Sequence, residues 1–193
     1  MKENQTYQSK IMPFTFRKAT TDDAARIWEI ILQAKEQMLR QQKQQWDETY
    51  PLPENITSDI RNGYACVLCN EGVIIAYGAV SFDGEPAYEA IEGKWLSEQP
   101  YVVVHRLAVA DEMKQKGIAT LFMQKVEEFS RGKGIHSFKV DTNFDNFYMH
   151  KMLERLGFVY CGEIIYGRIE KNDIFGRADK EAGRDGIKSK RKV

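Results

Sequence analysis

The residues best suited to chemistry lie in a turn, Lys114-Gln115-Lys116-Gly117-Ile118-Ala119, between an apolar strand-like run and an amphipathic helix. Gly117 and Ala119 have small side chains, so an anion could approach the backbone there. The first N–H groups of a helix lack intrahelical partners, and the helix dipole adds partial positive charge at the same end. Lys114 and Lys116 add cationic donors. The turn therefore predicts a binding site for a pyrophosphate group.

Two other kinds of anion-binding loop are excluded by spacing. A Walker loop needs a further glycine followed by Lys and Ser or Thr, and a dinucleotide loop needs three spaced glycines. Neither pattern occurs around Gly117. Because many helices that bind no ligand also start with one glycine near lysines, the turn needs support from the rest of the chain.

Hydrophobic periodicity indicates the elements that would position this turn. Alternating or apolar runs indicate strands, and apolar residues three and four apart indicate amphipathic helices. Strands are expected at 14–19, 64–70, 73–82, 101–109, 136–141 and from Phe158, and helices at 22–40, 54–62, 118–131 and 144–156. The order β-α-α-β-β-β-α-β-α-β predicts a mixed α/β layer fold.

A chain of 193 residues with 42% hydrophobic residues is expected to form one domain, here over residues 13–175. Residues 1–12 are polar and are expected to form a flexible arm. Residues 176–193 are charged and poor in large apolar side chains, so a disordered tail is expected. The run Tyr166–Lys171 is a short signal for a final strand. A homodimer in which a partner subunit supplies that strand is left open.

Charge and cysteine content limit the function classes. Lys plus Arg (28) balance Asp plus Glu (28), so no nucleic-acid partner is expected, although the basic end of the tail leaves that alternative open. Apolar runs are far shorter than the ~20 residues of a membrane-spanning helix, so no membrane partner is expected. The N-terminus does not resemble a secretory signal, which predicts a cytoplasmic location. Cys66, Cys69 and Cys161 are an odd number and are expected to be buried rather than metal ligands.

Two segments resemble the GNAT acyltransferase superfamily. The run Val104–Leu121 is similar to the family's central strand, its pyrophosphate loop of pattern Arg/Gln-x-x-Gly-x-Gly/Ala, and the following helix. Gly117 and Ala119 match this pattern, and Lys114 stands where Arg or Gln is usual. The run Asn146–Phe158 is similar to Asn-x-x-Ala-x-x-Leu-Tyr-x-x-x-Gly-Phe and matches at its first residue and its final Gly-Phe. The resemblance implies a GNAT-like, mostly antiparallel central sheet flanked by helices, with acetyl-CoA as cosubstrate and no metal.

The resemblance also implies how acetyl-CoA is held. Main-chain groups of the central strand would meet the pantetheine arm and polarise the thioester carbonyl. The turn would bind the pyrophosphate, and Asn146 would hydrogen-bond the coenzyme A arm. The cofactor-binding residues expected are Leu107, Ala108, Val109, Lys114, Gln115, Lys116, Gly117, Ile118, Ala119, Thr120, Asn146 and Met149.

The implied reaction is direct attack of a neutral amine on the thioester, which needs a base for the ammonium proton and an acid for the thiolate. Histidine is a common base in enzymes, so His105 is the candidate base, with Glu85 or a water chain as alternatives and packing beside the sheet as its other role. The family's acid is a tyrosine four residues before the Gly-Phe pair, where this chain has Leu153. Tyr148 lies five residues earlier on a different helical face, so it is a candidate either for catalysis or for cofactor contact.

Three residues are candidates for binding the acceptor, a primary amine of a small molecule or peptide. Trp46 and Tyr50 lie in an irregular loop and could line the acceptor cleft or belong to a satellite core. Arg106 is expected on the opposite strand face from His105 if alternation holds, where it could bind a carboxylate or phosphate or form a structural ion pair. Because Leu153 replaces the family tyrosine, the alternative function is a catalytically silent acyl-CoA-binding module.

Overall fold

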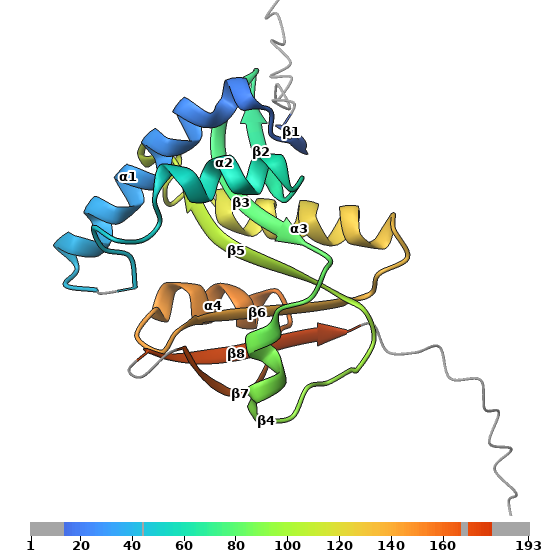
Figure 1. Cartoon of the computed structure of the whole chain (residues 1–193). Helices are drawn as coiled ribbons and strands as arrows, with labels where there is room; N and C mark the ends of the chain where they lie inside the picture. The colour runs from blue at the N-terminus through green and yellow to red at the C-terminus, as the bar shows by residue number, and fades with distance from the viewer. Residues whose placement is uncertain (1–13, 44, 167–169, 179–193) are drawn as a thin grey trace, which may run out of the picture. The chain divides into compact units, whose positions relative to one another are not determined.

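The computed structural model describes residues 14–43, 45–166 and 170–178, so the arm expected at 1–12 lies outside the described residues. The described chain contains eight strands and four α-helices (Figure 1). Its strands pair mostly antiparallel, which confirms the expected mixed α/β fold class. It divides into two compact units, one of residues up to Asp83 with Val103–Phe129 and the other of Gly84–Val102 with the residues from Ser130 onward.

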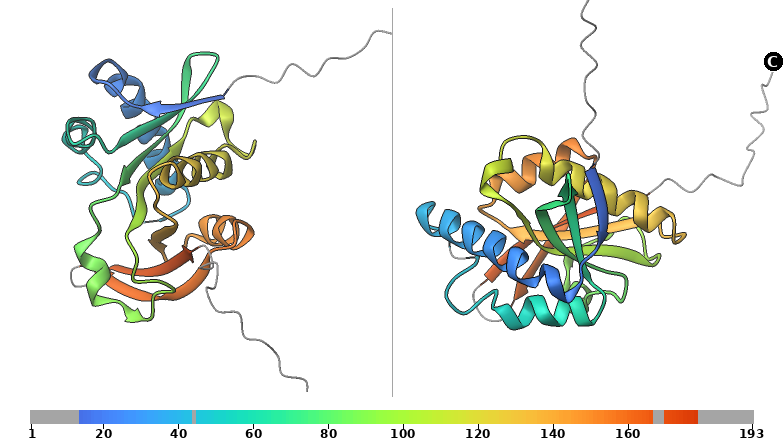
Figure 2. Two further views of the ribbon diagram at one scale, coloured as in Figure 1. Left: turned by 90° about the vertical axis from the view of Figure 1, so that its right-hand side faces the viewer. Right: turned by 90° about the horizontal axis from the view of Figure 1, so that it is seen from above.

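The first unit is an antiparallel sheet with helices on both faces. Its strands are β1 (Phe14–Lys18), β2 (Ala65–Asn70), β3 (Val73–Ser81) and β5 (Tyr101–Val109), side by side in that order. Its helices are α1 (Ala24–Arg40), α2 (Pro53–Arg61) and α3 (Ile118–Arg131). Helices α1 and α2 cover one face of β1–β3, and α3 covers the other (Figure 2).

The apolar stripes predicted for the helices face this sheet. Ile27, Ile30 and Ile31 of α1 are fully buried in a core cluster shared with Ile56 of α2 and with β2 and β3. On the opposite face, Phe122 of α3 is fully buried and packs edge-on against Phe16 of β1, with 5.3 Å between ring centroids. The period of three to four thus buries each helix on one side and leaves its polar side to solvent.

The second unit pairs the strands β6 (Ser137–Asn143), β8 (Glu170–Ala178), β7 (Val159–Tyr166) and the two-residue β4 (Glu92–Gly93) in that order, with α4 (Phe147–Arg155) as its helix. The insertion before β5 packs on β6. Lys139 of β6 is 5% exposed, and its ammonium lies 4.1 Å from the Trp95 ring centroid and 4.0 Å from that of Tyr101. Burial lowers the pKa of Lys139, and the electron-rich ring faces offset part of the cost of burying its charge.

Strand β8 corrects two expectations at the end of the chain. The tail was expected from residue 176, but the strand continues through Ala178, and only 179–193 lie outside the described residues. β8 pairs with β6 along its length and also with β7, so this chain supplies its own last strand. Gly176 leaves room for the Cys161 side chain of β7, because a Cβ there would lie 3.0 Å from the Cys161 sulfur.

Two further observations concern the expectations from composition. Cys66, Cys69 and Cys161 are buried free thiols, as expected, and burial raises the pKa of each. Over the part of the chain that the structure describes, no helix has the length and apolar character needed to cross a membrane.

The ion pair between Arg17 and Asp23 joins β1 to the start of α1. The guanidinium donates to both carboxylate oxygens at 2.7 and 2.9 Å and lowers the pKa of Asp23 to about 2. Because this folded-state pKa is below the unfolded value of about 3.9, the stabilisation is complete above that value and is lost as the pH falls through about 2.

We therefore expect Asp23→Asn to lower the free energy of unfolding at neutral pH by about 1–2 kcal/mol, a value reduced for screening because Arg17 is 39% exposed. The difference from the unaltered protein should shrink between about pH 4 and pH 2, as the wild-type carboxyl becomes protonated. Urea unfolding at stepped pH measures it. A constant difference over that range would contradict the assignment.

Candidate functional site

Strand β5 contains a β-bulge at the point where the sequence analysis expected the thioester contact. Its pairing with β3 is regular up to His105 and resumes at Ala108, and between them Arg106 and Leu107 lie opposite the single residue Gly78. Arg106 has φ of 55°, a left-handed conformation that a residue with a side chain rarely adopts. The extra residue bends the strand and redirects the backbone groups that follow it.

The bulge overturns the expected alternation of His105 and Arg106. His105 pairs with Ala79, which in turn pairs with Ala65, a member of the core cluster under α1 and α2. Arg106 reaches Asp59 of α2, so both side chains lie on this same face of the sheet. Strict alternation would have placed them on opposite faces, and the left-handed residue is the physical reason that it fails.

Arg106 belongs to a buried polar network. Its Nε and one terminal nitrogen donate to the two oxygens of Asp59 at 2.9 and 2.5 Å, and its other terminal nitrogen donates to the Tyr50 hydroxyl at 2.8 Å. The Tyr77 hydroxyl also donates to Asp59, which is only 4% exposed. This arrangement agrees with the structural ion pair, one of the two roles considered for Arg106, and assigns Tyr50 to the same network.

The groups of this network hold one another in fixed protonation states. Burial alone would lower the pKa of Arg106, but Tyr50 and Asp59 raise it above its usual range, so the guanidinium stays charged. Burial and the Asp59 carboxylate both raise the pKa of Tyr77, so its hydroxyl keeps the proton that it donates. The network is therefore a neutralised pair with a neutral donor, the form in which a buried charge is tolerated.

The anion-binding turn follows β5 after a short 3-10 helix, Asp111–Met113. Gln115 and Gly117 have φ of 61° and 76°, and left-handed residues near a helix start turn successive N–H groups toward one side. Leu121 N–H donates to Gly117 C=O at 3.0 Å, so α3 begins here and its first N–H groups have no intrahelical acceptor. Apart from Gly117 and its two chain neighbours, no heavy atom of the described residues lies within 4 Å of where a Cβ of Gly117 would be. The turn therefore combines donors, the positive end of a helix dipole and open space, the features that a pyrophosphate requires.

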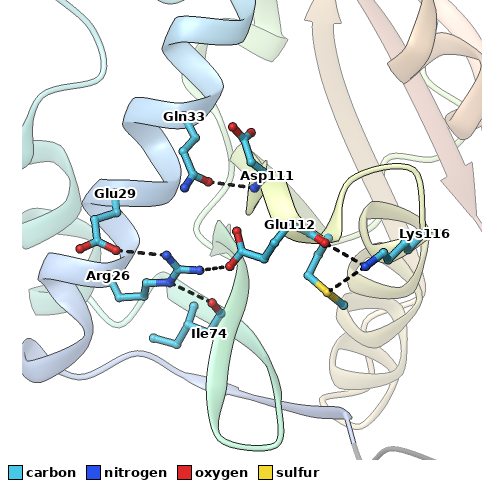
Figure 3. Close-up of polar contacts among 8 residues, drawn as sticks. Arg26, Glu29, Gln33, Ile74, Asp111, Glu112 and Lys116 are labelled. Carbon is cyan, nitrogen blue, oxygen red and sulfur yellow. Dashed lines mark hydrogen bonds and ion pairs between the residues drawn. The ribbon is translucent and has the colours of Figure 1, made fainter.

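The two lysines of the turn make contacts within it. Lys114 forms an ion pair with Asp111. The Lys116 ammonium donates to the Glu112 carbonyl at 2.9 Å (Figure 3). Both contacts stay within residues 111–116, and an ammonium that makes one such contact keeps further N–H donors for a ligand.

Helix α1 also fastens the turn (Figure 3). The side-chain oxygen of Gln33 accepts a hydrogen bond from Asp111 N–H at 2.9 Å. Arg26 forms an ion pair with Glu112 and donates to the Ile74 carbonyl at 3.2 Å. A glutamine and an arginine seven residues apart on one helix face therefore fix the start of the turn.

In the second unit, Asn146 is the N-cap of α4. Its side-chain oxygen accepts from Met149 N–H at 3.3 Å, so its amide N–H groups are the ones that could donate to a ligand. Tyr148 is 76% exposed, and Met149 is partly buried. Leu153, at the position of the family tyrosine, is fully buried in the core.

The remaining candidates fall in different environments. His105 is partly buried beside the bulge. Trp46 is 7% exposed and belongs to the core cluster of α1 and α2, which agrees with its alternative role in packing. Glu85 caps a short helix, where its carboxylate accepts from Ala87 N–H at 3.2 Å.

Sequence reasoning missed Asp59 and Tyr77. Asp59 lies three residues after Ile56, which is 1% exposed, so it falls on the buried stripe of α2. A carboxylate at a buried position requires a hydrogen-bonding or charged partner. The aspartate on the buried stripe of α2 was therefore the signal in the sequence that could have pointed to this network. The partner itself is 47 residues away in the chain, and nothing local identifies it.

Comparison with solved structures places this fold among acetyltransferases. A GNAT-family acetyltransferase from Streptococcus agalactiae 2603 is similar, with 30% identity, a TM-score of 0.79, and coverage of 87% of this chain and 96% of that one. The yncA protein of Salmonella typhimurium, solved with its cofactor acetyl-CoA, shares the fold at 18% identity and a TM-score of 0.61, with 90% and 98% of the two chains covered. A ribosomal-protein-alanine N-acetyltransferase from Brucella melitensis does so at 20% identity and a TM-score of 0.61, with 85% and 99% covered.

A family model described as the acetyltransferase (GNAT) family matches residues 26–158, a range that contains the bulge, the turn and the start of α4. The chain belongs to this family. A comparison with curated proteins found no match.

Proposed function

We propose that the protein transfers the acetyl group of acetyl-CoA to a primary amine of a small molecule or peptide. The observation that carries the proposal is the continuous path from the β5 bulge through the left-handed turn to the free N–H groups of α3, inside the segment that matches the family. Along this path, a strand with redirected backbone groups comes first and an anion-binding turn follows. This arrangement suits a ligand that has a reactive thioester at one end and a pyrophosphate farther along.

Each part of the path would hold one part of acetyl-CoA. The start of α3 would bind the pyrophosphate through backbone N–H groups, and the bulged strand would hold the pantetheine arm and polarise the thioester carbonyl. The α4 cap would add an amide donor. The proposed contact residues are Leu107, Ala108, Val109, Lys114, Gln115, Lys116, Gly117, Ile118, Ala119, Thr120, Asn146 and Met149.

The proposed reaction is direct attack of the neutral amine on the thioester carbon. A C–N bond forms, the C–S bond breaks, the ammonium proton passes to a base, and the thiolate leaves and takes a proton. His105 is the proposed base, because it lies beside the bulge and is partly exposed. The exposed Tyr148 remains the tyrosine candidate for protonating the thiolate, and water is the alternative.

A second candidate function is a catalytically silent acyl-CoA-binding module. It is favoured by Leu153, whose side chain is fully buried where the family places its acid, so no hydroxyl can take that role from the same position.

Thermal unfolding with and without acetyl-CoA tests both candidates. At a ligand concentration of about 100 times the dissociation constant, we expect the Tm to rise by about 5–10 °C. A panel of amines, read by release of free thiol, then separates the two: release with any amine supports the transferase, and a thermal shift without release supports the silent module. No shift at saturating acetyl-CoA would count against both.

The contacts between α1 and the turn lead to a further prediction. In the double variant Arg26→Met/Gln33→Leu, the turn loses its ion pair to Glu112 and the acceptor of Asp111 N–H, each worth about 1 kcal/mol or less at this partly exposed position. We expect the KM for acetyl-CoA to rise by about 3- to 10-fold with kcat nearly unchanged, because the groups that meet the thioester are untouched.

Arg40→Gln is the matched control for this double variant. Arg40 also lies on α1 and pairs with Glu36, but both side chains are more than half exposed and neither contacts the turn. This variant should leave the KM as it is. Equal KM values for the double variant and the unaltered protein would show that α1 does not organise the turn.

A further inference from the structure

The left-handed residue of β5 is unusual for its location. Among the residues that the structure describes, the other non-glycine residues with positive φ are Gln42, Glu71 and Gln115. Each of these lies in a turn or loop, whereas Arg106 lies inside a strand. An L-residue in this conformation is strained and persists only where its surroundings hold it. The bulge therefore needs a structural cause outside its own backbone.

The Asp59 carboxylate supplies that cause. It binds Arg106 through two hydrogen bonds, at 2.9 and 2.5 Å, from α2, an element 47 residues away in the chain. Asp59 has no freedom of its own, because it is 4% exposed and also accepts a hydrogen bond from Tyr77 of β3. A bidentate ion pair fixes both the position and the orientation of a guanidinium. A side chain anchored in this way restricts the φ and ψ values open to its own residue.

We propose that Asp59 is a positioning residue of the transfer reaction. Through Arg106 it holds the β5 bulge in its left-handed form and so sets the directions of the main-chain groups of Leu107, Ala108 and Val109. The inference rests on the proposed function, in which these groups meet the thioester. It gives Arg106 a role in shaping the site, and the acceptor is recognised by other residues.

The geometry of Arg106 agrees with this role. Three of its N–H groups are engaged by Asp59 and Tyr50, and its side chain is 15% exposed. A guanidinium that recognises an acceptor would need to present its fork to solvent, where a carboxylate could bind both prongs. Here Asp59 already binds Nε and one terminal nitrogen of the guanidinium, and Tyr50 binds the other terminal nitrogen.

Glycine provides the sharpest test, because it adopts a left-handed backbone without strain. Both Asp59→Asn/Arg106→Gly and Asp59→Asn/Arg106→Ala lack the ion pair. In the glycine variant the bulge can still form without strain. In the alanine variant the bulge must form against the preference of an L-residue. Asparagine in both variants keeps an acceptor for the Tyr77 hydroxyl. We expect kcat of the glycine variant to exceed that of the alanine variant by about 5- to 30-fold, the population ratio that the left-handed penalty implies.

Two measurements separate positioning from general stability. Coenzyme A keeps the pantetheine arm but lacks the acetyl group, so its dissociation constant should differ between the two variants by a smaller factor than kcat does. Amide hydrogen exchange of the unliganded protein should be faster around Leu107–Val109 in the alanine variant than in the glycine variant. Asp23→Asn, which removes the bidentate pair with Arg17, is the control and should lower the Tm without changing kcat.

The outcomes are distinct. Equal kcat values and equal exchange for the glycine and alanine variants would overturn the inference, as would a glycine variant less active than the alanine one. If the unaltered protein releases no thiol with any amine, the proposed function fails and the inference fails with it. If the double variants do not fold at the assay temperature, Tyr77→Phe replaces them as the test, because it removes one hydrogen bond from Asp59. This variant must lower kcat by a larger factor than it changes the dissociation constant of coenzyme A. The opposite result overturns the inference.

Discussion

Replacing Ala119 by glutamate is expected to weaken acetyl-CoA binding by about 100-fold or more while leaving the unliganded protein at least as stable. Ala119 is the second residue of α3, and by our proposal its N–H group meets the pyrophosphate. A carboxylate there would face another anion, and like charges brought together at an interface cost several kcal/mol. The same carboxylate interacts favourably with the positive end of the helix dipole, by about 0.3–1 kcal/mol. Affinity and stability should therefore move in opposite directions.

Ala119→Gln is the control, because glutamine has nearly the size of glutamate and no charge. Calorimetric titration with coenzyme A gives the affinities, and thermal unfolding without ligand gives the stabilities. The difference between the two variants should narrow as salt is added, since screening weakens the repulsion. If the glutamate variant binds as tightly as the glutamine variant at low salt, the pyrophosphate does not lie at the start of α3.

Local patterns were sufficient for the elements that surround this turn. The strand predicted at 101–109 and the helix at 118–131 have the same bounds in the structure, because a long apolar run and a three-to-four residue period are strong signals. The prediction of an anion site at the turn between them needed the family resemblance as well as the residue types, because small side chains at a helix start also occur where no ligand binds.

Strand β8 could not be predicted in the same way. Glu170–Ala178 contains only two large apolar residues, Ile174 and Phe175, and a glycine that reads as a strand breaker. It forms a strand because β6 and β7 bind it on both edges, so pairing overrides a poor local preference. The glycine leaves room for a cysteine side chain of β7, and this need exists only in the folded sheet.

The bulge and its network were missed for a related reason. Nothing near Arg106 in the sequence signals a left-handed residue, and its partners Asp59, Tyr77 and Tyr50 come from three other segments. The charge on the buried stripe of α2 indicated that Asp59 needed a partner, but several basic residues could have served. Interactions between segments far apart in sequence decide this part of the site, and single-sequence periodicity does not report them.

Arg106→Met is expected to lower the free energy of unfolding by about 3–5 kcal/mol, because it leaves the Asp59 carboxylate buried with only the Tyr77 hydroxyl as a donor. Methionine keeps most of the volume and, like arginine, carries a side chain at the left-handed position, so the change isolates the lost charge. For a domain of this size, such a loss corresponds to a fall in Tm of about 6–20 °C.

The double variant Asp59→Asn/Arg106→Met should recover most of this loss, since no unpaired charge remains and asparagine still accepts from Tyr77. Arg17→Met provides a matched comparison, because Arg17 makes a similar bidentate pair with Asp23 but is 39% exposed against 15% for Arg106. Solvent can replace the lost partner there, so the expected cost is about 1–2 kcal/mol. Urea unfolding of the four proteins measures these differences. A similar cost for Arg106→Met and Arg17→Met would mean that water reaches Asp59, and the bulge would then have to owe its shape to something other than a buried ion pair.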